Sequence, residues 1–261
     1  MKKFLSSFLL CLIFCTAVAG ELALADATGG AQLNMMQAAI ELSMEQKLDL
    51  FMRRLLPTAA LQELENGSVD AVIIDSRFVK DLPTVPLAAE ALVLYVSSAN
   101  PGADLTAAQV QEILFSHNPN WKKYNNLPMD IQRIMLKPLS SSGTLVQRVF
   151  GNKVLEDEIL KVESMSAGFA LSNSSSIFFA RYYPRFPMEL KCLPVNGTHP
   201  TSTTIVSGKY PLSLRYVIVY RKKTPALDTF IQFISSEKQR RQLRDAGFFV
   251  MLPEITREEK P

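Results

Sequence analysis

The chain has 261 residues, of which 48% are hydrophobic and 20% charged, and its formal net charge is +3. This composition is ordinary for a globular protein and excludes fibrous and low-complexity classes, whose compositions are strongly biased. The length suffices for one large domain or for two lobes of about 100 residues each.

The first 19 residues have the pattern of a secretory signal peptide. Two lysines precede an apolar segment at residues 4–15, and Ala-Val-Ala at 17–19 is a small-x-small cleavage site. The apolar segment is shorter than the roughly 20 residues of a membrane-spanning helix, so we expect export rather than a retained anchor. A second cleavage pattern at residues 23–25 competes, but it would destroy the strand predicted at residues 21–26.

Cleavage near Ala19 changes the cysteine count and the charge. Neither Cys11 nor Cys15 follows the small residues that a lipid-attachment site needs, so we expect a soluble periplasmic or secreted protein. Cys192 alone remains, which excludes an internal disulfide and is typical of a buried small hydrophobe. Losing two of the 28 basic residues leaves 26 against 25 acidic ones, a net charge of +1. This balance argues against a nucleic-acid partner.

Strand-like and helix-like segments alternate in the first part of the mature chain. We predict strands at 21–26, 47–53 and 69–75, and helices at 30–44 and 58–67. The last of these strands is almost continuously apolar, as in a buried parallel sheet. The order β-α-β-α-β indicates an open α/β sheet.

Two long apolar strands bracket the second part of the chain, and they are predicted at residues 89–101 and 210–223. Between them we expect a helix at 105–115 capped by Thr106, a loop at 118–128, strands at 131–138, 175–183 and 189–195, and a helix that follows a serine-rich segment. Two helices, at 225–236 and 237–247, end the fold before a frayed tail.

Three connecting segments share small polar residues. They are Thr28 and Gly29 after the first strand, Asp75, Ser76 and Arg77 after the strand at 69–75, and Ser141, Ser142, Gly143 and Thr144 before a helix. Ligands of open α/β sheets gather at the carboxyl ends of strands, and helix starts offer unpaired N–H groups to anions. Arg77 could pair with an oxyanion, and Asp75 could accept a hydrogen bond from a protonated one. The alternatives are a capped helix with a polar surface loop and a surface turn with a salt bridge.

Four segments carry a resemblance to a known family. They are SSANPGADLTAAQVQEILFSHNPNWKKYNNLPMDI at 97–131, SSSGT at 140–144, GKYPLSLRYVIVY at 208–220, and PALDTFIQFISSEKQRRQLRDAGFFVML at 225–252. Their order and spacing resemble those of the phosphate-type periplasmic substrate-binding proteins of ABC transporters. The resemblance implies an α/β, two-lobed periplasmic binding protein-like fold (type II) with two crossover strands, at 89–98 and 210–220.

The resemblance also implies a lobe division and a ligand site. Residues 20–97 and 212–261 would form one lobe and residues 98–211 the other, with the ligand between them. The implied ligand contacts are Thr28 and Gly29, Ser76 and Arg77, and Ser142, Gly143 and Thr144. The family's arginine four residues before the serine of Ser-Gly-Thr is Pro138 here, and the neighbouring Lys137 offers only a point charge.

The expected function is therefore capture of an oxyanion, phosphate before sulfate or molybdate, by a monomer that serves an ABC permease. A sensor or interaction module on the same scaffold is the alternative, since a fold does not fix a function. No cofactor or metal is expected. We do not expect an enzyme, because the two histidines lie far apart and the catalytic motifs of hydrolases, metalloproteases and nucleotide-binding enzymes are missing.

Overall fold

The computed structural model describes residues 20–252 except 32, 47, 138–142 and 152–158. The predicted signal peptide, Ser141 and Ser142 therefore lie outside the described residues. The helices are α1 (Met35–Gln46), α2 (Pro57–Glu65), η1 (Ser76–Phe78), α3 (Ala107–Phe115), α4 (Lys122–Asn125), α5 (Gly143–Phe150), α6 (Met165–Leu171), α7 (Ser202–Val206), α8 (Pro225–Ile234) and α9 (Glu237–Asp245). The strands are β1 (Leu22–Ala27), β2 (Leu50–Arg54), β3 (Ala71–Asp75), β4 (Thr84–Ser97), β5 (Gln132–Leu136), β6 (Leu160–Val162), β7 (Ser176–Arg181), β8 (Leu190–Cys192), β9 (Ser213–Tyr220) and β10 (Phe249–Val250).

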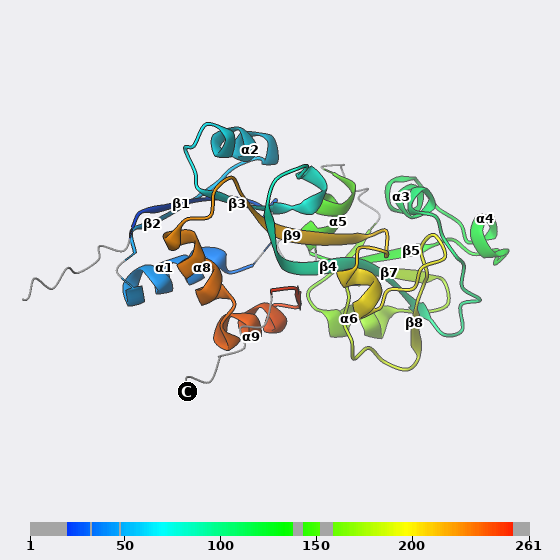
Figure 1. Ribbon diagram of the computed structural model, residues 1–261. Coiled ribbons are helices and arrows are strands. Elements are labelled where there is room, and N and C mark those ends of the chain that lie inside the picture. Colours follow the sequence, from blue (N-terminus) through cyan, green and yellow to red (C-terminus); the bar gives the residue numbers. More distant parts are fainter. Residues whose placement is uncertain (1–19, 32, 47, 138–142, 152–158, 253–261) are drawn as a thin grey trace, which may run out of the picture.

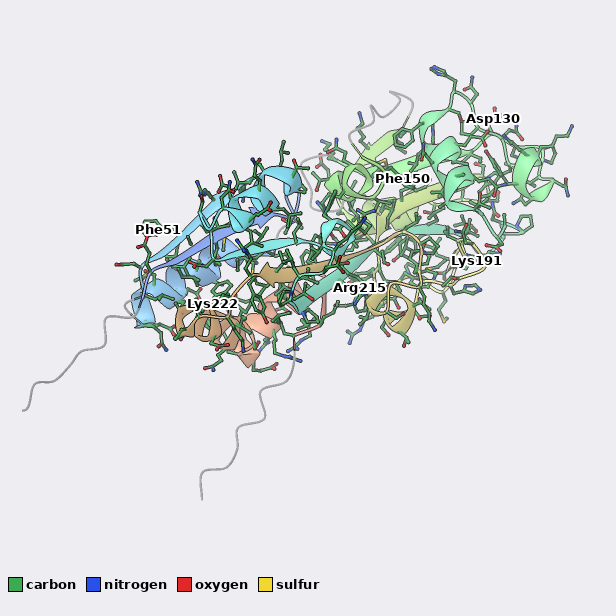
Figure 2. The ribbon with its side chains drawn as sticks, turned by 45° about the horizontal axis from the view of Figure 1, so that its top comes forward. Phe51, Asp130, Phe150, Lys191, Arg215 and Lys222 are labelled. Carbon is green, nitrogen blue, oxygen red and sulfur yellow. The ribbon has the colours of Figure 1, made fainter. Side chains whose placement is uncertain are left out.

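Two strands run through the middle of the molecule and join its halves. The described strands have the order β2-β1-β3-β9-β4-β7-β5-β6, and β8 and β10 pair with β4. The first half of β4 pairs antiparallel with β9, whereas its second half pairs with β7 and β8. Figure 1 shows β4 and β9 side by side in the centre, and Figure 2 shows Phe51 and Asp130 at opposite ends of the elongated molecule. The predicted α/β class with two crossover strands is confirmed.

The strand β4 begins earlier than predicted, at Thr84 instead of residue 89. Pro86 hides this start in the sequence, because proline cannot donate to a strand ladder. The pairing with β9 continues through it by a register shift between Pro86 and Ala88. The lobe boundaries at 97/98 and 211/212 stay predictions. They fall next to the last residue of β4, Ser97, and just before the first residue of β9, Ser213.

Helices cover both faces of the first half of the sheet. Side chains alternate between the faces of a strand, so Ile73 belongs to the main core with Leu42 of α1, whereas Val72 and Ile74 pack with Leu64 of α2. Figure 1 shows α2 on one side of β1 and β3, and α1 and α8 on the other. The parallel pairing of β1 with β2 and β3 confirms the predicted β-α-β-α-β segment.

The first helix begins five residues later than predicted, at Met35 rather than residue 30. Gly29 and Gly30 have φ values of 67° and 86°, and Asn34 has a φ of 55°. Such positive φ values are incompatible with a right-handed helix. The loop after β1 is therefore longer than expected and does not open directly into α1.

The second half contains the predicted helix α3 and several short elements that were not predicted. Thr106 caps α3, and its Oγ1 accepts a hydrogen bond from the Gln109 N–H at 3.1 Å. The short helix α4 lies inside the predicted loop at 118–128, and α6 and α7 have only 7 and 5 residues. A Cβ on Gly168 of α6 would lie 2.3 Å from Cζ of Phe178, so this glycine permits close packing of α6 on the sheet.

Cys192 on β8 is partly buried. Burial raises the pKa of its thiol to about 12, so the thiol is protonated at neutral pH. Within the described residues, no helix combines the length and the apolar character that a membrane crossing requires.

Candidate functional site

The described parts of the predicted segments meet around Arg148. A Cβ on Gly29 would lie 3.6 Å from Cγ and from Cδ of Arg148, which places the loop after β1 against this side chain. Arg148 Nη1 donates to Thr144 Oγ1 at 2.7 Å, one helical turn earlier on α5. Arg77 Nη2 donates to the backbone carbonyl of Arg148 at 3.1 Å. The loop after β1 and η1 are thus both brought against α5.

The polar groups of the first two loops also have local partners. The N–H and Oγ1 of Thr28 donate to Asp26 Oδ1 at 3.0 and 2.7 Å. Asp75 Oδ1 accepts from the Arg77 N–H at 2.9 Å, and Asp75 Oδ2 lies 2.8 Å from Nε and 2.6 Å from Nη2 of Arg77. The carboxylate of Asp75 is thus engaged by Arg77, and Ser76 lies between them in η1.

A buried ionic cluster lies next to these loops and was not predicted. Its centre is Glu90 of β4, whose side chain is 0% exposed. Glu90 Oε1 accepts from Arg148 Nη2 at 2.8 Å and from the hydroxyl of Tyr216 at 2.6 Å. Glu90 Oε2 lies 2.7 Å from Arg181 Nη2, an ion pair outside hydrogen-bond geometry. The cluster therefore joins β4, α5, β7 and β9.

The C-terminal part of the chain supports Arg181. Arg181 Nη1 donates to the carbonyl oxygen of Ala246, directly after α9. The guanidinium carbon lies 4.5 Å from the centroid of the Phe248 ring, within cation–π range. The cluster thus contacts the end of the fold as well as both crossover strands.

Burial and mutual attraction set the charges in the cluster. Burial alone would lower the pKa of Arg148, but Glu90 and Tyr216 outweigh it and the net shift of this pKa is upward. Burial raises the pKa of Tyr216 well above its ordinary value, and the Glu90 carboxylate raises it further. At neutral pH, Arg148 is charged and Tyr216 is a neutral phenol that donates to Glu90.

The sequence contained faint signals of this cluster. Glu90 interrupts the apolar run at 85–96, and a charge in such a run needs a buried partner. Arg148 follows Thr144 by four residues, so both lie on one face of α5. Neither signal identifies the partner, because the partners come from distant strands.

Two cavities lie in different parts of the molecule. A cavity of about 740 Å³ lies in the second half and is lined by residues such as Phe169, Tyr183 and Phe186. Another of about 410 Å³ lies beside the loop after β1 and is lined by Gly30, Met35 and others. Within the described ranges, no group of three histidine, cysteine or acidic side chains could hold a metal ion.

The family model for the PBP superfamily domain matches residues 20–238. The chain belongs to the PBP superfamily. The match covers both crossover strands and every described residue of the convergence point, and it stops within α9. No curated protein sequence matches this PBP-superfamily chain.

Three crystal structures have a similar fold. A possible phosphate binding protein from Planctomyces limnophilus is 18% identical with a TM-score of 0.73, over 91% of this chain and 94% of that one. PstS from Borrelia burgdorferi is 19% identical with a TM-score of 0.69, over 88% and 98%. An ABC-type phosphate transport receptor from Vibrio cholerae is 21% identical with a TM-score of 0.61, over 89% and 100%. These likenesses and the family match confirm the two-lobed PBP fold predicted from the sequence.

Proposed function

We propose that this chain is an exported solute-binding protein that captures an oxyanion, phosphate first, between its lobes for an ABC permease. The observation that carries the proposal is the convergence of the loop after β1, η1 and α5 on Arg148, whose side chain lies against Gly29 and Thr144 and whose backbone carbonyl accepts from Arg77. The similar structures named as phosphate receptors and binding proteins support the choice of anion.

The physical basis is the same set of features that other anion sites use. The N–H groups at the start of α5 and its dipole favour negative charge. The proposed site comprises Thr28, Gly29, Asp75, Ser76, Arg77, Ser141, Ser142, Gly143 and Thr144. Closure of the lobes would exclude water and strengthen each hydrogen bond.

The choice of phosphate over sulfate depends on a carboxylate. A carboxylate beside the anion repels fully ionised sulfate but accepts the proton of hydrogen phosphate. Asp75 was predicted for this role, and its carboxylate is already paired with Arg77. Asp75 can therefore discriminate phosphate from sulfate only if the bound anion competes with Asp75 for Arg77.

The remaining parts of the proposal follow from the same class. We propose a periplasmic or secreted monomer without catalytic function, cofactor or metal. A sensor on the same scaffold would bind the same anion, and loss of growth on limiting phosphate after deletion of the gene would favour transport.

Calorimetry on residues 20–261 tests the binding function. Phosphate should bind, and Thr144→Ala should weaken it about tenfold to a hundredfold, since a hydrogen bond to a charged group contributes roughly 1.5–3 kcal/mol. Thr203→Ala, at an exposed position of α7, is the matched control. If phosphate, sulfate, molybdate and small carboxylates all fail to bind, the proposed function is wrong.

A further inference from the structure

We propose that the cavity of about 740 Å³ in the second half of the molecule binds a small zwitterion with an apolar body. This chemistry is shared by aromatic amino acids and short apolar peptides. None of the residues that line the cavity belongs to the three segments of the proposed anion site. Binding at this cavity would therefore be a second activity, independent of oxyanion capture.

The walls of the cavity are aromatic and come from two separate elements. Phe169 belongs to α6, and Phe186 belongs to the segment between β7 and β8. Each of these rings meets the buried ring of Tyr95 edge-on, with the centroids 5.3 Å apart. Tyr183 extends the aromatic surface, and its ring centroid lies 6.3 Å from that of Phe169. Such a surface favours a ligand with an apolar or aromatic body.

The segment that carries Phe186 is fixed at both of its ends to β4 or to the residue directly after it. The Tyr95 hydroxyl accepts a hydrogen bond from the Tyr183 N–H at 2.7 Å. At the other end, the Ser98 N–H donates to the carbonyl oxygen of Glu189 at 2.6 Å. The cavity is therefore formed before a ligand arrives, so binding does not have to order this segment.

One side chain of each charge lines the cavity. Arg185 and Glu189 both contribute to the lining, and both are exposed to water. Within the described part of the chain, neither of these two side chains forms an ion pair. A ligand with only a negative charge would be repelled by Glu189, and one with only a positive charge by Arg185. A zwitterion satisfies both, with its carboxylate on Arg185 and its ammonium on Glu189.

The size of the cavity favours a dipeptide over a single amino acid. Sites for drug-sized ligands have volumes of about 300–1,000 Å³, and this cavity lies in the upper part of that range. A dipeptide such as L-leucyl-L-phenylalanine brings two apolar side chains, one ammonium and one carboxylate. We expect its Kd to be on the order of 10–100 μM, and that of L-phenylalanine to be about tenfold higher.

Titration calorimetry of residues 20–261 with L-leucyl-L-phenylalanine, with and without phosphate, tests the proposal. The wild-type protein should bind the dipeptide equally well in both buffers. Arg185→Gln and Glu189→Gln should each weaken binding about threefold to tenfold, since each ion pair would be partly exposed to water. Both positions are exposed, so the variants should fold. The matched controls are Arg241→Gln and Glu163→Gln, at side chains 78% and 74% exposed.

Two capped peptides show which charge each side chain recognises. N-acetylation removes the ammonium, so Glu189→Gln should cause no further loss of affinity for the acetylated dipeptide. Amidation removes the carboxylate, so Arg185→Gln should cause no further loss for the amidated dipeptide. Losses as large as those with the uncapped dipeptide would overturn the zwitterion assignment.

Three other results would overturn the proposal. They are absence of binding of both the dipeptide and L-phenylalanine, wild-type affinity in both Arg185→Gln and Glu189→Gln, and displacement of the dipeptide by phosphate. Tighter binding of L-phenylalanine than of the dipeptide would support the site and identify the amino acid as its ligand. Failure of the wild-type protein to bind any oxyanion would reject the proposed function and leave this site unaffected.

Discussion

Two arginine–carboxylate pairs lie beside α5, and they are built in opposite ways. Asp75 and Arg77 are two residues apart, and the arginine side chain is 50% exposed. Glu90 and Arg148 are 58 residues apart, and their side chains are 0% and 6% exposed. The first pair is a local strand-end motif in contact with water. The second joins β4 and α5 inside a buried cluster that also includes residues of β7 and β9, so removing one of its partners should cost much more stability.

The most damaging change in this comparison is Glu90→Gln. It leaves Arg148 and Arg181 facing a neutral amide in a buried site, and removing one partner of a buried ion pair costs about 3–5 kcal/mol. We expect the free energy of unfolding, measured by urea denaturation, to fall by that amount.

An exposed carboxylate provides the control for Glu90→Gln. Glu163 pairs with Lys137, and its side chain is 74% exposed. Glu163→Gln should change the free energy of unfolding by less than about 1 kcal/mol. Equal effects of the two substitutions would show that burial does not distinguish the pairs.

Removal of one hydroxyl from the cluster should have an intermediate effect. Tyr216→Phe keeps the ring that packs edge-on against Phe248 but removes the hydrogen bond to Glu90 at 2.6 Å. We expect a loss of about 1.5–3 kcal/mol in the free energy of unfolding. Tyr183→Phe, at a tyrosine 46% exposed, is the control and should cause a much smaller change. A loss below 0.5 kcal/mol, on the order of a surface substitution, would contradict this account.

Tyr216 should also make stability depend on pH under alkaline conditions. Its pKa is raised in the folded state, so the folded chain keeps a proton that the unfolded chain releases above about pH 10. The stability from this proton is complete below that pH and is lost as the pH rises. Tyr216→Phe should remove about 1.4 kcal/mol per pH unit from the slope, leaving the contributions of Tyr95 and Tyr210. Identical slopes in both proteins, from urea denaturation at several pH values, would count against a buried neutral phenol.

The smallest effect belongs to the local pair. Arg77→Gln removes an ion pair that water screens, and we expect a change of about 1 kcal/mol or less in the free energy of unfolding. Thermal unfolding at low and high salt measures it, and the wild-type contribution should shrink at high salt. If Arg77→Gln lowers the free energy of unfolding as much as Glu90→Gln does, Arg77 must stabilise the packing of η1 on α5 through its hydrogen bond to the Arg148 carbonyl.

The fold could be predicted to the extent that hydrophobic periodicity is long and regular. The strands β1 to β3 and the helices α3, α8 and α9 were all predicted, because each carries a clear apolar pattern or a cap. The short elements α4, α6, α7, β6 and β10 were missed, since a few residues do not complete a period. The predicted start of α1 was wrong because the sequence around Asn34 does not reveal the positive φ of this residue.

The residues of the candidate site likewise fall into those with a local sequence signal and those without one. Thr28, Arg77 and Thr144 were predicted because strand ends and helix starts leave local signatures, and the structure brings their segments together. Glu90, Arg148 and Arg181 were not, because their meaning depends on the register between β4, β7 and β9. A charged residue in an apolar run shows that a partner exists, but only the three-dimensional arrangement shows which one.

The contact of Arg181 with the carbonyl of Ala246 has a consequence for the order in which the molecule is completed. Residues 249–250 pair with Ala88 and Ala89, immediately before Glu90. The strand that carries the central carboxylate thus acquires its last neighbours only when the final part of the chain has emerged from the ribosome. A nascent chain lacks these contacts for nearly the whole of its synthesis, so the surroundings of Glu90 are completed late.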